Sequence, residues 1–269
     1  DMQLEDLEPN QVAARCDCVF SCLPHGASAS AVRQLLEAGK RVVDFSADYR
    51  LKNADVYAEW YGQKHVDPEN LAQAVYGLPE LFGDLIPAAQ LIANPGCYPT
   101  SAILGLTPFL KAEMIDPSGI IVDSKSGVSG AGRTPKLMTH YPECNESVVA
   151  YNVGRHRHTP EIDQVLSTVC GHDVQVVFTP HLIPMDRGIL TSAYAQPVGN
   201  MTEERLFAAL REFYAGKPFI RVVEHLPATK DVAGAALAVC PRGIVWCLEA
   251  SDMHFELSYE MKALVQVVR

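Results

Sequence analysis

The feature that most restricts the fold is an alternation of short apolar runs with an amphipathic run near the start of the chain. Residues 18–22 and 41–45 have the length and composition of strands, and residues 28–38 between them have the helical period. Gly39 ends that helix, and residues 90–93 form a third strand-like run. Strand, helix and strand at this spacing are typical of a parallel sheet with right-handed crossovers. We therefore predict an α/β fold that begins with a parallel sheet.

The pattern changes in the second part of the chain. A helical run over residues 98–111 and a strand over 120–123 lead into a loop rich in glycine and serine. Strands are predicted again over 174–178 and 188–195, this time with no helix between them. Two strands in succession favour a mixed or antiparallel sheet. We expect a second, α+β domain with a mixed sheet, separated from the first at residues 96–97.

Composition narrows the possible partners. The net charge of −10 argues against nucleic acid, which needs clustered Lys and Arg side chains. No apolar stretch approaches the ~18 residues of a membrane span, and no export signal is visible. The 8 cysteines of such a chain are expected to be free thiols in a reducing compartment, and their spacing matches no metal site. We expect a cytoplasmic protein with no nucleic acid, membrane or metal partner.

Residues 94–100, Asn-Pro-Gly-Cys-Tyr-Pro-Thr, place a cysteine where a strand turns into a helix. The Pro-Gly pair forces the turn, and the residues that follow suit a first helical turn. A thiol at Cys97 would meet unpaired backbone N–H groups and the positive end of the helix, which favour the thiolate. A buried, inert cysteine is the other interpretation of this run, and the run alone does not decide between them.

The run 151–161, Tyr-Asn-Val-Gly-Arg-His-Arg-His-Thr-Pro-Glu, is the second candidate for chemistry. Its last three residues suit a helix start, with Thr159 as the N-cap. His158 would then lie beside a positive helix end, which disfavours its protonated form and suits a general base. Arg155 and Arg157 could bind a phosphate or carboxylate. A solvated surface segment is the alternative.

Three further segments are candidates for binding. Residues 124–133 form a Gly/Ser loop whose N–H groups could make an anion nest, although Gly-x-x-Gly-x-Gly is not the dinucleotide fingerprint and an ordinary turn would explain it. Residues 178–188 hold Arg187 in a loop that contains two prolines. Residues 44–50 close a predicted parallel strand, where ligands of open α/β sheets bind.

Together these segments resemble the N-acetyl-gamma-glutamyl-phosphate reductases, enzymes of the arginine pathway that are related to the aspartate-semialdehyde dehydrogenases. The similar runs occur in the family's order and span residues 18 to about 232. They are residues 19–26, 44–50, 75–81, 94–100, 126–133, 150–162 and 178–190.

The resemblance implies NADPH-dependent reductive dephosphorylation. Cys97 matches the nucleophile, whose thiolate attacks the γ-acyl phosphate and releases phosphate. Hydride converts the resulting thioester to a hemithioacetal, which collapses to the semialdehyde. We favour His158 as the acid/base because it abuts the predicted helix start, with His156 as the alternative, since the family pattern does not separate them.

The resemblance also implies the remaining site residues, an acyl-phosphate substrate, the cofactor NADP and a homo-oligomer, dimer or tetramer. The substrate-binding candidates are Asn94, Arg50, Arg157, Glu161, Arg187 and Tyr151. The cofactor-binding candidates are Ser126, Gly127, Ser129, Gly130, Pro24 and His25. The implied domains are an incomplete Rossmann-like remainder of a dinucleotide-binding domain (1–96), a catalytic and dimerisation domain (97–228) and a C-terminal segment that returns to the first domain (229–269).

Two departures from the family pattern stand out. Its N-terminal phosphate loop, Gly-x-x-Gly-x-x-Gly, has no counterpart, so the chain is expected to be a fragment that starts after that unit. Its Asp-Asn-Leu-x-Lys-Gly run is also absent, and after about residue 234 an atypical or frameshifted tail is expected. We therefore expect a reactive Cys97 with little NADPH-dependent turnover.

Rival hypotheses remain open at this point. An aspartate-semialdehyde dehydrogenase would use the same nucleophile on a different acyl phosphate. A cysteine hydrolase would pair Cys97 with His158 and need no cofactor. A truncated, cofactor-free remnant would fold without turnover.

Overall fold

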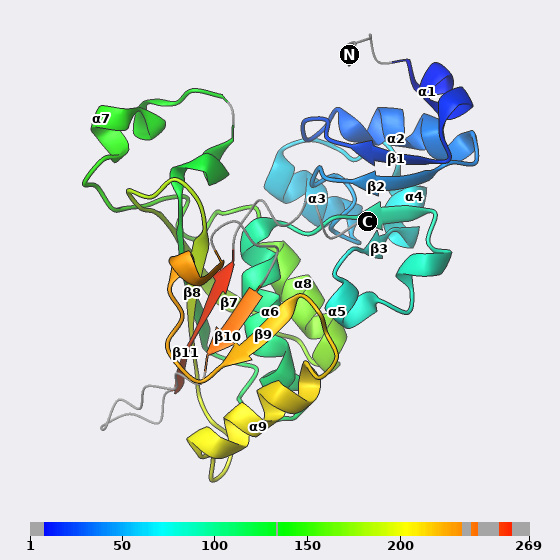
Figure 1. Ribbon diagram of the computed structural model, residues 1–269. Coiled ribbons are helices and arrows are strands. Elements are labelled where there is room, and N and C mark those ends of the chain that lie inside the picture. The colour runs from blue at the N-terminus through cyan, green and yellow to red at the C-terminus, as the bar shows by residue number, and fades with distance from the viewer. Residues whose placement is uncertain (1–7, 133, 233–237, 242–252, 260–269) are drawn as a thin grey trace. The chain divides into compact units, whose positions relative to one another are not determined.

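The computed structural model describes residues 8–132, 134–232, 238–241 and 253–259 (Figure 1). The chain divides into two compact units, Asp1–Gly96 and Cys97–Arg269. The first unit carries a parallel sheet and the second a mixed one, which confirms the predicted α/β class.

The first unit is a parallel sheet with the strand order β1-β2-β4-β3. Its strands are β1 (Cys18–Ser21), β2 (Arg41–Asp44), β3 (Val75–Tyr76) and β4 (Leu91–Ala93). Its helices are α1 (Pro9–Arg15), α2 (Ser28–Glu37), α3 (Ala54–Tyr61), α4 (Pro68–Gln73), α5 (Pro79–Phe82) and the 3₁₀ turn η1 (Ile86–Ala88). The three strands predicted from the sequence are adjacent in this sheet.

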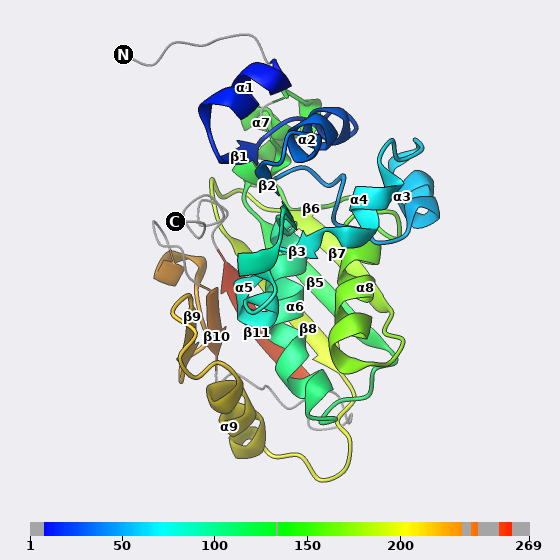
Figure 2. The ribbon, with the colours of Figure 1, turned by 90° about the vertical axis from the view of Figure 1, so that its right-hand side faces the viewer.

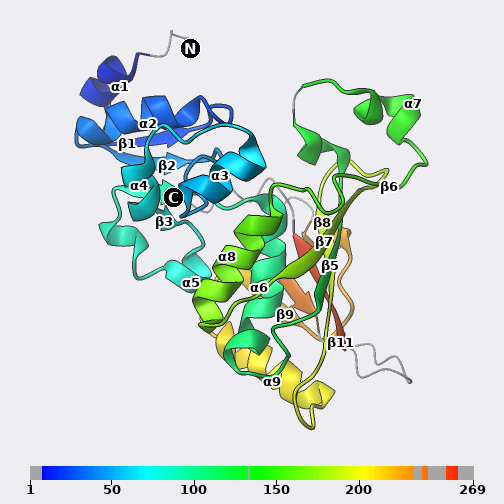
Figure 3. The same cartoon turned by 180° about the vertical axis from the view of Figure 1, so that it is seen from behind.

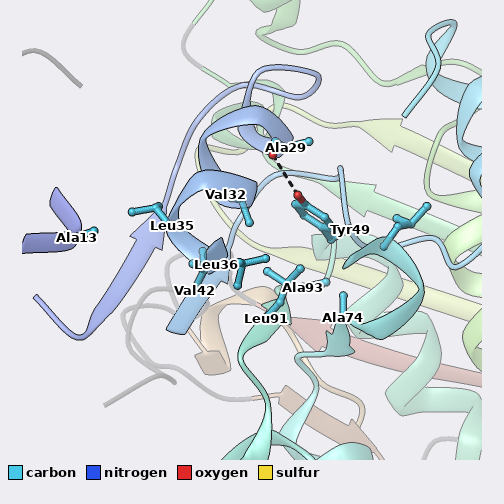
Figure 4. Close-up of a cluster of buried hydrophobic side chains, with 11 residues drawn as sticks. Ala13, Ala29, Val32, Leu35, Leu36, Val42, Tyr49, Ala74, Leu91 and Ala93 are labelled. Carbon is cyan, nitrogen blue, oxygen red and sulfur yellow. Dashed lines mark hydrogen bonds between the residues drawn. The ribbon is translucent and has the colours of Figure 1, made fainter. Parts of the chain in front are cut away.

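The core of the first unit forms where α2 packs on the sheet (Figure 4). Val32, Leu35 and Leu36 recur at the helical spacing and meet Leu91 of β4 within one buried cluster. Each buried side chain of this size stabilises the fold by roughly 1.5–3 kcal/mol. Tyr49 belongs to the cluster, and its hydroxyl donates to the carbonyl of Ala29 (3.1 Å), so it is buried with its polar end satisfied.

The second unit is a mixed sheet with the order β6-β7-β5-β8-β11-β10-β9. Its strands are β5 (Ile120–Ser126), β6 (Val149–Ala150), β7 (Val176–Leu182), β8 (Ile189–Ala195), β9 (Ile220–Val223), β10 (Ala238–Pro241) and β11 (Met253–Tyr259). Its helices are α6 (Cys97–Lys111), α7 (Tyr141–Cys144), α8 (Thr159–Cys170), α9 (Glu203–Phe213) and the 3₁₀ turns η2 (Val128–Ala131), η3 (Leu137–Thr139) and η4 (Thr229–Val232).

The successive strands β7 and β8 lie on either side of β5, the first parallel to it and the second antiparallel. Among the described parts of residues 229–269, the strands β10 and β11 pair within this second sheet. The sequence predicts instead that this segment returns to the first domain. The rest of the expected atypical tail lies outside the described residues.

The sheet of the second unit has one face covered by α6 and α8 (Figures 2 and 3). Burial alternates along β5 and β7, so that every second residue points to the opposite face. Ile121 and Val177, a cross-strand pair, are 44% and 61% exposed there. In the described part of the chain, no helix covers this opposite face, which we call the open face.

Helix α6 is the central element of the second unit, because every side chain from Tyr98 to Leu110 is buried. Pro108 lies inside it and has no N–H to donate to the carbonyl of Leu104, four residues earlier. The hydroxyl of Tyr214, at the end of α9, donates to that carbonyl. Tyr214 thus satisfies a backbone acceptor that the proline leaves without its helical partner.

Replacing Tyr214 with phenylalanine is therefore expected to lower the free energy of unfolding by about 1–3 kcal/mol, because a buried carbonyl loses its donor. Urea unfolding would measure the change. Tyr141→Phe, at a side chain that is 76% exposed, is the matched control and should be neutral. Equal stability of the Tyr214 variant and the control would contradict the pairing.

Candidate active site

The carboxyl end of the first sheet is organised around the buried carboxylate of Asp48. It accepts hydrogen bonds from the N–H of Gly26 (2.8 and 3.0 Å to its two oxygens), the N–H of Ala29 (3.1 Å) and the hydroxyl of Tyr57 (2.8 Å). The two N–H groups lie at the start of α2, where a helix favours an anion. Asp48 therefore fills this anion position with the chain's own carboxylate.

Pro24 and His25, two of the predicted cofactor residues, lie in the turn between β1 and α2. The carbonyl of Pro24 accepts from the N–H groups of Ala27 (3.1 Å) and Ser28 (3.2 Å). The Nδ1 atom of His25 accepts from the N–H of Ala47 (2.9 Å). Both residues thus hold the shape of the turn.

Arg50 and Asn94, two predicted substrate residues, are in direct contact. The Nε atom of Arg50 donates to the carbonyl of Asn94 (2.7 Å), and its Nη2 donates to the carbonyl of Phe45 (2.9 Å). Arg50 is only 7% exposed, so its guanidinium ties together the segments that follow β2 and β4. The sequence did not indicate this bracing role.

In the second unit, Cys97 is the first residue of α6, half-buried and free of disulfide. The helix begins one residue earlier than predicted, which places the thiol in its first turn. Tyr98 follows it, and its hydroxyl pairs with the hydroxyl of Tyr151 (2.9 Å). Burial raises the pKa of Tyr151 to about 12, and the negative charge of Cys97 adds to the rise.

Both candidate histidines pack against Tyr98. The ring centroids of His156 and His158 lie 5.6 and 5.9 Å from that of Tyr98, and 4.8 Å from each other. Tyr151 and Phe178 also contact the ring of His156, at 5.5 and 5.3 Å. The structure therefore brings four predicted site residues of the second unit, Cys97, Tyr151, His156 and His158, into one neighbourhood.

His156 is neutral in this environment. Burial, followed by the positive charge of Arg157, lowers its pKa to about 4. Its Nδ1 atom accepts a hydrogen bond from the N–H of His158 (3.2 Å), so its own proton lies on Nε2.

His158, not Thr159, occupies the N-cap position of α8. The helix runs Thr159–Cys170 with His158 at the N-cap, so the predicted start is displaced by one residue. The side chain of His158 makes no capping hydrogen bond to the helix. Its position next to the helix start is as predicted.

The lowered pKa of His156 predicts a pH-dependent loss of stability. The unfolded state binds a proton below about pH 6.5, whereas the folded state resists it down to about pH 4, so stability falls as pH falls through this window. Between pH 7 and 4.5 the loss is about 2–3 kcal/mol at ~1.36 kcal/mol per pKa unit. Urea unfolding of the chain and of His156→Gln would measure it.

The comparison with His156→Gln is needed because a second buried group, Asp163, changes the stability of the folded state in the opposite direction as pH falls. Burial raises the pKa of Asp163 to about 6, so its protonation stabilises the folded state as pH falls. His156→Gln leaves that contribution in place. Equal losses in the two proteins would contradict the assignment to His156.

The predicted anion nest is wrong for residues 127–129, because their N–H groups already have backbone partners. Those of Gly127, Val128 and Ser129 donate to carbonyls of residues 188, 185 and 186 at 3.0, 2.8 and 3.0 Å. That of Gly130 donates to Gly127 (3.2 Å). A Cβ atom on Gly127 would lie 2.5 Å from the carbonyl oxygen of Asp186, so this glycine permits contact between two loops, not with an anion.

The other predicted residues of the second unit have varied surroundings. Arg157 is exposed beside His156, and Arg187 holds the carboxylate of Asp186 through Nη1 (2.7 Å). Glu161 is 1% exposed in the first turn of α8, where a helix favours negative charge. Ser126 is buried, and its hydroxyl donates to the carbonyl of Gly127 (3.0 Å).

Two structural residues were missed by the sequence-based predictions. Tyr98 connects the nucleophile to the histidines, and Asp48 fixes the turn before α2. Both lie inside runs already singled out, Tyr98 beside Cys97 and Asp48 before Arg50, but nothing in the runs indicates the distant partners of their side chains.

Free thiols are present at Cys16, Cys18, Cys22, Cys97, Cys144 and Cys170. Within the described part of the chain, no three His, Cys, Asp or Glu side chains are grouped to hold a metal ion. None of the helices that the structure describes is long and apolar enough to cross a membrane.

Comparison with known families gives two matches. The NAD-binding domain model of the semialdehyde dehydrogenases matches residues 1–89, and their dimerisation domain model matches residues 97–241.

Curated relatives are similar over most of the chain. N-acetyl-gamma-glutamyl-phosphate reductase from Rhodopirellula baltica is 52% identical over 90% of this chain and 72% of the relative. The protein of that name from Desulforudis audaxviator is 48% identical over 94% and 75%. A crystal structure of aspartate semialdehyde dehydrogenase II from Vibrio cholerae matches with a TM-score of 0.70 at 14% identity, covering 92% of this chain and 75% of that one, which shows a shared fold.

Proposed function

Because the chain belongs to the N-acetyl-gamma-glutamyl-phosphate reductase family, we propose that it reduces N-acetyl-gamma-glutamyl phosphate to the semialdehyde through a thioester on Cys97. The reaction is a step of arginine biosynthesis, and NADPH supplies the hydride in this family. The observation that carries the proposal is the position of Cys97 at the start of α6, next to the tyrosine that contacts both histidines. A biosynthetic role of this kind supports a cytoplasmic location.

The first half of the reaction is the acylation of Cys97. The sulfur of Cys97 attacks the γ-acyl carbon, a C–S bond forms, and the C–O bond to phosphate breaks with the electron pair leaving on phosphate. The N-terminus of α6 stabilises negative charge on the attacking sulfur and on the acyl oxygen. The products are an acyl thioester and free phosphate.

The contacts of the two histidines support different roles. Because the Nδ1 atom of His156 is occupied by a backbone N–H, this residue offers Nε2–H as a hydrogen-bond donor. We assign it to bind a developing negative charge. His158, at the start of α8, is assigned to take the thiol proton and to return a proton later.

The anionic parts of the substrate need cationic and polar groups. We assign this role to Arg157 and Arg187, which are exposed, with Tyr151 and Glu161 shaping the site from within the second unit. From the first unit we retain Asn94 and Arg50, where the arginine acts mainly by holding the backbone of Asn94. We assign substrate chemistry and dimerisation to residues 97–228 and cofactor binding to residues 1–96.

The described residues fit the cofactor only in part. The anion position at the start of α2 is filled by Asp48, and the N–H groups of residues 127–130 have backbone partners. Neither segment therefore offers backbone donors to a pyrophosphate. We therefore limit the proposed cofactor contacts to parts of NADPH other than the pyrophosphate. The residues are Pro24, His25, Ser126, Ser129 and Gly130.

Single-turnover acylation tests the proposal. With N-acetyl-gamma-glutamyl phosphate and no NADPH, the chain should release one phosphate per molecule and gain an acyl group on Cys97, both detected by phosphate assay and intact-protein mass. Faster acylation by β-aspartyl phosphate would favour an aspartate-semialdehyde dehydrogenase. Continuous phosphate release would indicate a hydrolase, and no adduct with either compound would indicate an inactive remnant.

We further infer that two copies of the chain associate through the open face of the second sheet. The dimerisation domain model covers strands β5 to β10 of this sheet, and the face carries the exposed pair Ile121 and Val177 beside the half-buried Tyr194. Exposed apolar patches of this kind mark protein interfaces, and a two-fold axis would bury the same patch on both copies.

Val177→Glu is expected to convert the oligomer to monomers, because two carboxylates would be buried in each two-fold interface. Sedimentation velocity would measure the change. The control is Val198→Glu, at a residue 46% exposed but outside the sheet strands. Unchanged sedimentation of the Val177 variant would exclude this face.

A further inference from the structure

Tyr98, the residue after the thiol, contacts both the histidines and the strand β7. It is 2% exposed, and its hydroxyl lies 2.9 Å from the hydroxyl of Tyr151 and 3.3 Å from the carbonyl of His181. Either tyrosine hydroxyl can donate in the bond between them, whereas the carbonyl of His181 can only accept from Tyr98. The hydrogen-bonded chain therefore runs from Tyr151 through Tyr98 to the backbone of β7.

The segment that carries the histidines follows the short strand β6 and leads into α8. Residues 152–155 are exposed, and Asn152 has a positive φ of 48°. The N–H of Tyr151 donates to the carbonyl of Pro180 (3.1 Å), and the next helix along the chain is α8. The side-chain bond between the two tyrosines therefore anchors the start of the loop that leads to His156.

The ring of Tyr98 completes the arrangement. It meets His156 edge-on at 86° and His158 at 68°, and it lies against Phe178 of β7 at a centroid distance of 5.3 Å. These contacts come from the residue directly after Cys97 on a helix that is buried along its length.

We propose that Tyr98 is a positioning residue, whose hydroxyl fixes Tyr151 and thereby both histidines relative to Cys97. The inference rests on the proposed function, because the positioned groups are the assigned nucleophile and proton carriers. It adds a residue that touches neither substrate nor cofactor and acts only through its neighbours.

Tyr98→Phe tests this, since it removes one oxygen atom and keeps the ring. The acylation rate at saturating N-acetyl-gamma-glutamyl phosphate is expected to fall at least tenfold, with the half-saturating concentration within threefold of the original. The pH profile of Cys97 alkylation by iodoacetamide is expected to shift. Tyr151→Phe should have the same effects, and the double variant should be no worse than either single one.

Tyr214→Phe is the matched control, because it also removes a buried hydroxyl bonded to α6 but at Leu104, away from the first turn. It should lower stability and leave the acylation rate unchanged. If Tyr98→Phe keeps the original rate, or if the two variants lose the same fraction of it, the positioning role is wrong. Additive losses in the double variant would also contradict it.

A readout without substrate separates this inference from the proposed function. Imidazole NMR signals of His156 and His158 should shift in Tyr98→Phe and stay in place in Tyr214→Phe. If the chain forms no thioester but these signals shift, the function fails and the positioning stands. If thioester forms and the signals of both variants match the original, the positioning fails and the function stands.

Discussion

Replacing Cys97 with serine is expected to lower the rate of acylation by N-acetyl-gamma-glutamyl phosphate at least about 1000-fold. A hydroxyl at the start of α6 does not ionise near neutral pH, so it cannot use the charge stabilisation that the helix end gives to a thiolate. The fold should persist because the change in volume is small. Intact-protein mass and phosphate release would measure the loss.

A free thiol elsewhere provides the control for this substitution. Cys170, half-buried at the end of α8, also forms no disulfide, and Cys170→Ser should keep the original acylation rate. Iodoacetamide at pH 6 should label Cys97 faster than a cysteine in the denatured chain. If Cys97 reacts no faster than that reference, its assignment as an activated nucleophile is wrong.

The second large effect is expected at His158. His158→Gln should reduce the acylation rate by about 100- to 1000-fold, which is the usual contribution of a positioned acid/base. Single-turnover acylation rates of the variant and of the original chain would measure the loss.

His156→Gln is the internal comparison, since the side chain is adjacent and of the same type. Its Nδ1 atom already accepts a backbone hydrogen bond, so it is assigned only a donor role, and a loss of less than about tenfold is expected. A larger loss at His156 than at His158 would reverse the two assignments.

The local features of the fold could be predicted from the sequence. The spacing of Val32, Leu35 and Leu36 predicts the buried face of α2, and the turn before Cys97 predicts a helix that starts within one residue of the thiol. Both depend on residues close together in the chain. This is the range over which hydrophobic period and turn chemistry are informative.

What could not be predicted depends on distant partners. The sequence of residues 127–129 predicts an anion nest, but in the structure carbonyls of residues 185, 186 and 188, more than fifty positions later, accept from their N–H groups. The sequence favours Arg50 as a ligand-binding cation, but in the structure its Nε–H donates to the carbonyl of Asn94. Backbone acceptors do not show in a sequence, so the structure was needed to distinguish bracing residues from binding residues.

The burial of α6 also determines how reactivity responds to heat. Local opening of this helix would expose thirteen consecutive buried residues, from Tyr98 to Leu110. The free energy of such an opening approaches that of unfolding the whole unit, so its amide hydrogens should exchange with solvent only when the unit unfolds globally. Cys97, at the start of this helix, is therefore not displaced by a separate unfolding transition. On heating, the reactivity of Cys97 and the folded structure of the second unit are then lost in the same transition. No folded intermediate with a displaced nucleophile is expected.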